Sequence, residues 1–294
     1  MPRHIRVYRR LEGDLLRSGK IVLQVDDSFF DLTEKLWESG SPLLLSTLAA
    51  RGWFEPQRFD AWLDEAEPPP ARPIAADDVL LPPLLPTEVG KILALGKNFR
   101  AHAAEFDEAV PEEPMFFNKL PETMRGHNQT ISPPKGYAGR LDHEAELAVV
   151  IGRKLERVDQ EAAFESVAGY MVANDLTLRT TQGADRALQY PWFRSKNFDG
   201  ACPIGPCFVP AAQLNPSELK ISAFVNGRSR QEAHLRDMVV TVPHAISYLS
   251  QHVTLRPGDI ILMGTPAGVG PLESGDEVIC TIPGIGELRT LVRR

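Results

Sequence analysis

The chain has 294 residues, of which 43% are hydrophobic, so it can bury a full core as one large domain or as one large and one small domain. A net charge of -7, with short basic clusters only near the chain ends, gives no positive field for a phosphate backbone and argues against nucleic-acid binding. No apolar run approaches the ~18 residues of a membrane span and the first residues lack a signal-type apolar core, so we expect a cytoplasmic protein without membrane contact. The three cysteines, Cys202, Cys207 and Cys280, make no disulfide framework, and we expect buried thiols.

The first part of the chain predicts a small N-terminal α/β domain over residues 1–70. Short strands are expected at 5–7 and 21–25, and helices are expected to start near Asp31 and after Ser41. A third helix, over 56–67, should end at a run of three prolines. Further prolines up to residue 86 exclude regular structure there, so we assign 71–90 as a proline-rich linker and 91–294 as the catalytic domain.

After the linker, the sequence predicts a strand over 91–95, a turn at Gly96 and a helix over 98–106. On that helix, His102 and Glu105 stand at positions i and i+3 and therefore share one face. A glutamate that accepts the proton of one imidazole nitrogen leaves the other nitrogen able to take a proton from water. The alternative is a pair of solvated neighbours on the surface. The next expected strand, 115–119, bears a lysine.

Acidic residues alternate at Asp142, Glu144 and Glu146, immediately before the apolar run 147–151. In a strand these acids share one face, and the apolar run is typical of a strand buried on both sides. Two such carboxylates can hold one Mg²⁺, Mn²⁺ or Ca²⁺ ion, although acid alternation is also common on solvated edge strands. A second strand, over 169–175, ends at Asp175, which is either a third ligand or a cap for the following segment.

The segment 192–199 alternates aromatic residues, cations and an acid around Lys196. A partly desolvated lysine can bind a substrate carboxylate or neutralise an enolate oxygen, although surface salt bridges are the commoner role. Further on we expect a hairpin turn at 226–227, a helix over 243–253, a strand over 260–263 and a closing hairpin over 276–291. The glycine-rich loop 264–270 lacks a Walker lysine and a following helix, so it fits a loop close to a small ligand better than a phosphate cradle.

Taken together, these stretches resemble the fumarylacetoacetate hydrolase family from about residue 91 to residue 292. The family pattern reads Gly-x-Asn-aromatic-x-x-His-x-x-Glu, Asp-x-Glu-x-Glu-Leu-Ala-Val-Val-Ile-Gly, Gly-Tyr-x-x-Ala-Asn-Asp, Trp-Phe-x-x-Lys-x-Phe-Asp and Gly-Thr-Pro-x-Gly-Val-Gly. This chain carries the five motifs in the same order, at 96–105, 142–152, 169–175, 192–199 and 264–270. The implied fold is strand-rich α+β, a mixed β-sandwich roll that usually forms a homodimer.

The resemblance also implies roles for individual residues. It implies Glu144, Glu146 and Asp175 as ligands of Mg²⁺ or Mn²⁺, and a catalytic dyad of His102 and Glu105 on a mobile lid. The remaining implied residues are Lys196 as a catalytic group and Arg179, Gln182, Gly264 and Thr265 as groups that bind the substrate.

The implied reaction is hydrolysis of a carbon-carbon bond in a small 2,4-dioxo acid of the acylpyruvate or fumarylpyruvate type, through a metal-stabilised enolate. The same enolate would serve a decarboxylase or isomerase of oxaloacetate-like or 2-hydroxymuconate-like acids, which the family also contains. A metal-dependent binding protein without catalysis is a third reading, against which the combination of metal ligands and general base argues. Two departures, the loop 123–129 with His127 and the residue Thr180, bear on the distal pocket, and we interpret His127 as a loop residue.

Overall fold

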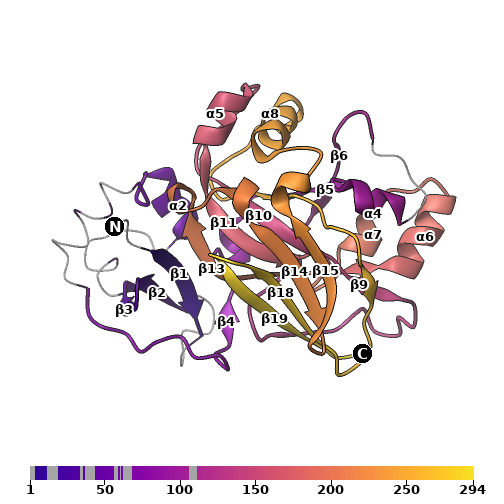
Figure 1. Cartoon of the computed structure of the whole chain (residues 1–294), viewed down its shortest axis with the longest axis horizontal. Helices are drawn as coiled ribbons and strands as arrows, with labels where there is room; N and C mark the ends of the chain where they lie inside the picture. Colours follow the sequence, from indigo (N-terminus) through magenta and orange to yellow (C-terminus); the bar gives the residue numbers. More distant parts are fainter. Residues whose placement is uncertain are drawn as a thin grey trace.

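Strands dominate the computed structural model, which describes residues 4–11, 19–33, 36, 44–55, 59, 61, 68–105 and 111–294 (Figure 1). The strands are β1 (Ile5–Arg10), β2 (Lys20–Val25), β3 (Ser28–Asp31), β4 (Leu80–Leu81), β5 (Ile92–Gly96), β6 (Met115–Lys119), β7 (Met124–Arg125), β8 (Thr130–Ile131), β9 (Leu141–His143), β10 (Ala145–Ile151), β11 (Val167–Asn174), β12 (Thr177–Leu178), β13 (Cys202–Pro210), β14 (Lys220–Val225), β15 (Arg228–His234), β16 (Ile260–Leu262), β17 (Gly270–Pro271), β18 (Glu277–Ile282) and β19 (Gly286–Val292). The helices are α2 (Leu45–Ala50), α4 (Arg100–Ala104), α5 (Gln160–Glu165), α6 (Arg179–Ala187), α7 (Phe193–Lys196) and α8 (Val242–His252). The expected strand-rich α+β class is confirmed.

The described strands form three sheets. The largest has the order β3-β2-β1-β13-β11-β10-β16-β5-β6, with β4 paired to β1 and β7 paired to β13. A second sheet has the order β15-β14-β18-β19-β8, and a small third sheet has the order β12-β9-β17. Figure 1 shows β14, β18 and β19 lying across β10 and β11, so the two larger sheets pack face to face.

Strand β10 is buried on both faces because a separate core lies against each face. Leu147 and Val149 belong to the core between the two large sheets. Ala148 and Val150 belong to the core on the other side, which contains Leu23 and other apolar residues of the N-terminal part. The run 147–151 is therefore the doubly buried strand that its composition predicts.

The acidic stretch is not one continuous strand, as the sequence suggested, because it breaks at Glu144. β9 ends one residue before Glu144 and belongs to the small sheet, and β10 begins one residue after it. At the break, the Glu144 backbone N–H donates to the side chain of Asn174 at 2.9 Å instead of to a backbone carbonyl of a neighbouring strand. The break turns Asp142 away from the other two acids.

The N-terminal part extends the largest sheet. β1 pairs with β13 at Val7 and Phe208, and it also pairs with β4 of the proline-rich linker. The linker is thus not wholly irregular, since it contributes the two-residue β4 and one 3-10 turn, η1 (Pro86–Glu88). Most of the expected helices near residue 31 and over 56–67 lie outside the described residues. The division into domains at 71–90 stays a prediction.

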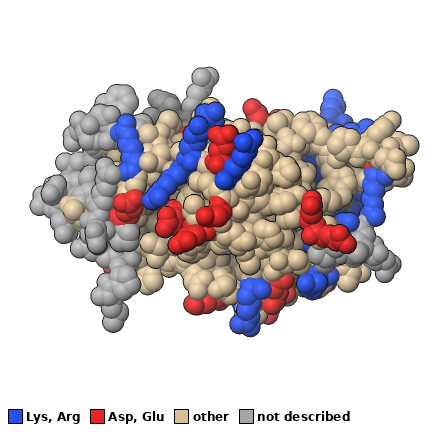
Figure 2. All heavy atoms as spheres, turned by 90° about the horizontal axis from the view of Figure 1, so that it is seen from above, with Lys and Arg blue, Asp and Glu red and all other residues tan. Residues whose placement is uncertain are grey.

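Most of the other predicted elements are present. The hairpin at 226–227 joins β14 and β15, and the last hairpin joins β18 and β19. The three cysteines are buried and free, and burial raises the pKa of each thiol to about 12. None of the described helices is long and apolar enough to cross a membrane. On the face drawn in Figure 2, cationic and anionic side chains are interspersed.

Candidate active site

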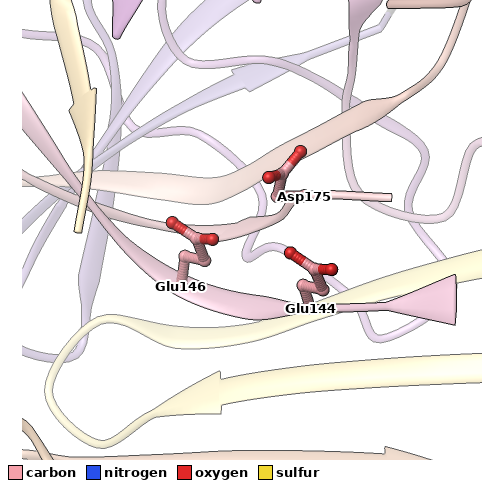
Figure 3. Close-up of side chains that lie close together, drawn as sticks. All are labelled: Glu144, Glu146 and Asp175. Atoms are coloured by element: carbon pink, nitrogen blue, oxygen red, sulfur yellow. The ribbon is translucent and has the colours of Figure 1, made fainter. Parts of the chain in front are cut away.

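Three carboxylates converge where β10 begins and β11 ends. Glu144, Glu146 and Asp175, here called the carboxylate triad, each offer an oxygen, and these oxygens lie within 4.8 Å of one another (Figure 3). The register between β10 and β11 produces this meeting, since Ala145 is paired with Asn174 directly between the acids. All three side chains are buried, with exposed fractions of 4%, 1% and 0%.

The electrostatics of the triad favour a bound cation. Burial, and then the charges of Asp175 and Glu144, hold the pKa of Glu146 well above its usual range. Burial acts in the same direction on Glu144, but Lys196 and Arg179 outweigh it and hold the pKa of Glu144 far below its usual range. A buried set of oxygen-only ligands suits Mg²⁺ or Mn²⁺, and a cation would relieve the repulsion that raises the pKa of Glu146. The residues present therefore fit the metal that the sequence implied.

Two buried lysines compensate the triad from one side. Lys196 Nζ donates to Glu144 Oε2 at 2.8 Å and to Asp175 Oδ2 at 2.5 Å. Lys119, at the end of β6, places its Nζ 2.7 Å from Asp175 Oδ1. The desolvation expected for Lys196 is present, because its side chain is 3% exposed and its Nζ lies 5.0 Å from the centre of the Phe117 ring. The sequence showed a lysine at the end of this strand, but its pattern predicted no role for Lys119.

Arg179 connects the triad to the acid that turned away. Its Nε donates to Asp142 Oδ2 at 2.8 Å, its Nη2 donates to Glu144 Oε1, and its Nη1 donates to Gln182 at 2.6 Å. Asp142 is fully buried and also accepts two hydrogen bonds from Arg140. Arg179 was predicted to bind substrate; the structure places it beside Glu144, with part of it at the cavity wall.

The predicted dyad forms on α4. His102 Nδ1 lies 3.0 Å from Glu105 Oε2, so Nδ1 carries a proton, and in the neutral imidazole Nε2 has the lone pair. Asn98 anchors the start of this helix by bonding to backbone groups of Val240 and Met263. Glu105 is tied from the opposite side, because its Oε1 accepts the backbone N–H of Gly268 at 2.7 Å. Residue 106, the expected helix end, lies outside the described residues.

The triad and His102 line one cavity of about 250 Å³. Other predicted residues that line it are Lys196, Arg179, Gln182 and Thr265. Two predicted residues stand directly behind its wall: Glu105 holds His102, and Gly264 donates its N–H to Glu146 Oε2 at 2.7 Å. The cavity wall also includes Lys97, Phe117 and Arg186, for which the sequence predicted no role, and Trp192 of the motif at 192–199.

The two departures from the family pattern lie away from this wall. His127 accepts the backbone N–H of Arg289 through Nδ1 at 3.1 Å and packs beside β19, as a loop histidine would. Burial lowers the pKa of His127. Thr180 accepts the backbone N–H of Arg140 at 2.9 Å. Among the residues described, none of 123–129 and not Thr180 lines the cavity.

Comparison with known proteins finds the family that the five sequence motifs resemble. Residues 91–293 match the model of the family described as fumarylacetoacetate (FAA) hydrolase C-terminal. Over 203 residues the chain is 41% identical to an oxaloacetate tautomerase of Escherichia coli strain K12, which covers 68% of this chain and 92% of the relative.

A longer match and a solved structure extend the comparison. Over 283 residues the chain is 36% identical to an Escherichia coli bifunctional isomerase/decarboxylase of 4-hydroxyphenylacetate degradation; this covers 94% of this chain but 63% of the relative, so the chain spans less than two thirds of that protein. The crystal structure of a fumarylpyruvate hydrolase from Pseudomonas aeruginosa, in complex with Mn²⁺ and pyruvate, is 34% identical with a TM-score of 0.66 and covers 73% of this chain and 91% of that one.

Proposed function

This chain belongs to the fumarylacetoacetate hydrolase family, and from that membership we propose that it is a metal-dependent enzyme that converts a small 2-oxo dicarboxylic acid through its enolate. The observation that carries the proposal is the meeting of the carboxylate triad and the His102–Glu105 dyad in one cavity of about 250 Å³. A metal site alone would suit a binding protein, but a buried histidine oriented by a glutamate supplies a base that binding does not need.

The charges around the triad support a substrate with two carboxylates. Four buried acids, Asp142 and the triad, are faced by four cations, which are Lys119, Arg140, Arg179 and Lys196. The charge of a divalent ion would therefore remain for the substrate to balance. Lys97 and Arg186 add positive charge to the same cavity wall, and burial together with Arg186 lowers the pKa of Lys97.

The chain's own residues divide the chemistry as follows. A divalent ion at the triad would polarise the 2-oxo group and stabilise negative charge on its oxygen. His102 takes the proton from the carbon next to that group through Nε2, while Glu105 holds Nδ1–H and stabilises the imidazolium. Lys196 directs two ammonium protons to Glu144 and Asp175 and can donate the third to the enolate oxygen. In an isomerisation, His102 then returns the proton to the substrate at a different atom from the carbon that lost it.

We place tautomerisation or isomerisation of an oxaloacetate-like acid first, because a relative that is 41% identical over 203 residues and a relative that matches over 283 residues carry those names. Hydrolysis of an acylpyruvate, the first expectation from the sequence, is the second candidate. Hydrolysis is favoured by the Mn²⁺ and pyruvate complex of the fumarylpyruvate hydrolase. In this reaction His102 would take a proton from water instead of from carbon. The homodimer implied by the family stays part of the proposal.

The first test follows three substrates with metal-stripped protein, with and without added Mg²⁺ or Mn²⁺. Oxaloacetate, a 2-hydroxymuconate-type dienoate and a simple acylpyruvate are monitored by enol absorbance and by pyruvate formation. Enol loss without pyruvate identifies a tautomerase or isomerase, and pyruvate from oxaloacetate or from the acylpyruvate identifies a decarboxylase or a hydrolase. We expect turnover only with metal, and turnover that is equal without metal would overturn the proposal.

The matched variant is His102→Ala, which should lower kcat/KM by about 10² to 10⁴-fold, the usual contribution of general acid-base catalysis. Metal affinity, measured by calorimetry, should stay within about twofold, because His102 is not one of the grouped carboxylate ligands. Unchanged turnover in this variant would remove the dyad from the mechanism. Binding of oxaloacetate without any turnover would point to the binding protein instead.

A further inference from the structure

Gln231 is a buried polar residue on a mostly exposed strand. Along β15 its neighbours Arg230 and Glu232 are exposed, whereas Gln231 is 1% exposed. The register between β14 and β15 shifts near this point, and the strand turns the Gln231 side chain towards the loop that follows β16. A buried amide needs partners for two acceptor sites and two donor protons, and Gln231 has all of them.

Two backbone groups fix the orientation of this amide. The N–H of Ala145 donates to Gln231 Oε1 at 3.0 Å, and Gln231 Nε2 donates to the carbonyl oxygen of Pro266 at 2.8 Å. A backbone N–H can only donate and a carbonyl can only accept, so turning the amide over would place like groups together. The Oε1 atom also lies 3.1 Å from His143 Nδ1, which must therefore carry its proton.

The fixed amide determines what the hydroxyl of Thr265 can do. The second proton of Gln231 Nε2 is donated to Thr265 Oγ1 at 2.7 Å. Because Thr265 Oγ1 accepts this bond, its own proton must point away from Gln231. Thr265 lines the cavity beside the triad, so the direction open to that proton is the cavity.

We propose that Gln231 is a positioning residue that makes the Thr265 hydroxyl a hydrogen-bond donor to a carboxylate or keto oxygen of the bound substrate. The inference rests on the proposed function, since it takes the ligand to be a 2-oxo acid. It adds a residue that does not touch the substrate and that stands on β15, a strand outside the cavity wall. The chain of contacts runs from His143 through Gln231 to Thr265 and involves described residues alone.

A double-mutant cycle tests the proposal. Gln231→Met keeps the length of the side chain without its donor protons, Thr265→Val removes the hydroxyl at nearly constant volume, and Thr265→Ser retains the hydroxyl. With the preferred substrate of the wild type, Thr265→Val should raise KM about tenfold, as for loss of a hydrogen bond to a charged group. Gln231→Met should raise KM by about three- to tenfold, and Thr265→Ser should stay within about twofold.

The decisive measurement is the combined variant Gln231→Met/Thr265→Val. If Gln231 acts through the Thr265 hydroxyl, the combined variant has the KM of Thr265→Val alone, and the Mn²⁺ affinity of each variant equals that of the wild type. If Gln231→Met multiplies KM by the same factor in both backgrounds, Gln231 only supports the fold and the proposal is wrong. An increase in KM for Thr265→Ser equal to that for Thr265→Val would also overturn the proposal.

A second variant and a binding measurement allow the role of Gln231 to be tested if Gln231→Met does not fold or if no substrate is converted. If Gln231→Met does not fold, Gln231→Glu takes its place; its carboxylate accepts the Thr265 proton and should raise KM at least as much. If the wild type converts none of the three substrates, the proposed function fails by itself. The same cycle is then measured on the dissociation constant of oxalate for the Mn²⁺-loaded protein, where equal factors in both backgrounds again refute the role of Gln231.

Discussion

Asp142 stands in the same acidic run as Glu144 and Glu146, but its carboxylate serves two arginines instead of the triad. Arg140 bonds it with Nε and Nη2, and Arg179 bonds it with Nε while reaching on to Glu144. The charge of Asp142 thus holds Arg179 in the position from which it contacts Glu144. We infer that Asp142 affects the triad only through this arginine.

Replacing Asp142 by Asn should therefore weaken both folding and metal binding. The variant keeps the shape but leaves Arg179 without its second anionic partner, and removing one member of a buried ion pair costs about 3–5 kcal/mol of unfolding free energy. Arg179 would then draw Glu144 towards itself, and we expect metal affinity to fall about tenfold. Urea unfolding and calorimetry with Mn²⁺ measure the two effects.

Arg140→Gln is the matched control, because the Arg140 side chain is 46% exposed. This substitution leaves Arg179 in place. Its cost should be about 1 kcal/mol or less, and metal affinity should remain within about twofold. Equal metal affinity in Asp142→Asn and in the wild type would contradict the link through Arg179.

The sequence predicted which residues gather around the cavity better than it predicted how they hold one another. His102, Glu105 and Lys196 stand in motifs whose spacing already indicates chemistry. Lys119 and Gln231 gave no such signal, since each lies on a strand of unrelated pattern and meets its partners only in the folded protein. A lysine within an apolar strand is the one clue that Lys119 offered.

Among the elements, the loop between β16 and β17 contributes to the site at several points. It carries Thr265, its Gly264 N–H bonds Glu146, and its Gly268 N–H bonds Glu105. Gly268 has a φ of +101°, and an added Cβ would lie 1.9 Å from the backbone oxygen of Arg230. The loop thus passes so close to β15 that no side chain fits at this position.

Gly268→Ala should lower both stability and catalysis. Gly275 is a matched control, because its φ of +93° imposes a similar backbone cost while its Cβ would meet nothing within 4 Å. We expect Gly275→Ala to lose about 1–2 kcal/mol for the left-handed backbone. Gly268→Ala should lose about 1–3 kcal/mol more, because the loop must shift. Urea unfolding measures both values.

The same pair separates the catalytic role of the loop from its stability. In Gly268→Ala the shift moves Thr265 and the partner of Glu105, so kcat/KM should fall more than tenfold, as small misplacements at active sites do. Gly275→Ala should keep kcat/KM within about twofold. Equal kinetics in the two variants would show that the loop does not position the site.

Two elements were predicted wrongly because residue types within a short stretch indicated a different structure. β13 is a central strand of the largest sheet, but its sequence contains prolines and a glycine and was not identified as a strand. The sheet accommodates them because the pairing of β13 with β11 shifts register in the middle. The break at Glu144 was missed for the opposite reason, since alternation alone predicts a continuous strand.

At the scale of the whole molecule, a buried ion pair ties the N-terminal part to the linker. Arg9 of β1 is fully buried, and its Nη2 lies 2.8 Å from Glu88 Oε1. Glu88 also accepts the backbone N–H groups of Leu85 and Ser46, so one carboxylate connects β1, the linker and α2. Burial, only partly offset by Glu88, lowers the pKa of Arg9.

Arg9→Met should lower the free energy of unfolding by about 3–5 kcal/mol, because it leaves the Glu88 carboxylate buried without its cation. Arg9→Met/Glu88→Gln removes that charge and should recover part of the loss. Since β1 shares a sheet with β13, we expect one cooperative unfolding transition in every variant, seen at the same urea concentration by fluorescence and by circular dichroism. Two separated transitions would instead support an independently folding N-terminal domain.

The carboxylate triad and His102 are held by very different parts of the fold. Two acids of the triad lie at the start of β10, a strand that is enclosed by two cores, so a change there must satisfy packing on both sides at once. His102 stands on a five-residue helix, and Lys97 and Arg186 line the same cavity. The carboxylate triad is therefore difficult to alter, while the groups to which we assign proton transfer and substrate selection can be exchanged with a smaller loss of stability. Such a scaffold can acquire a new reaction by a few substitutions around the cavity without any change to its carboxylate triad.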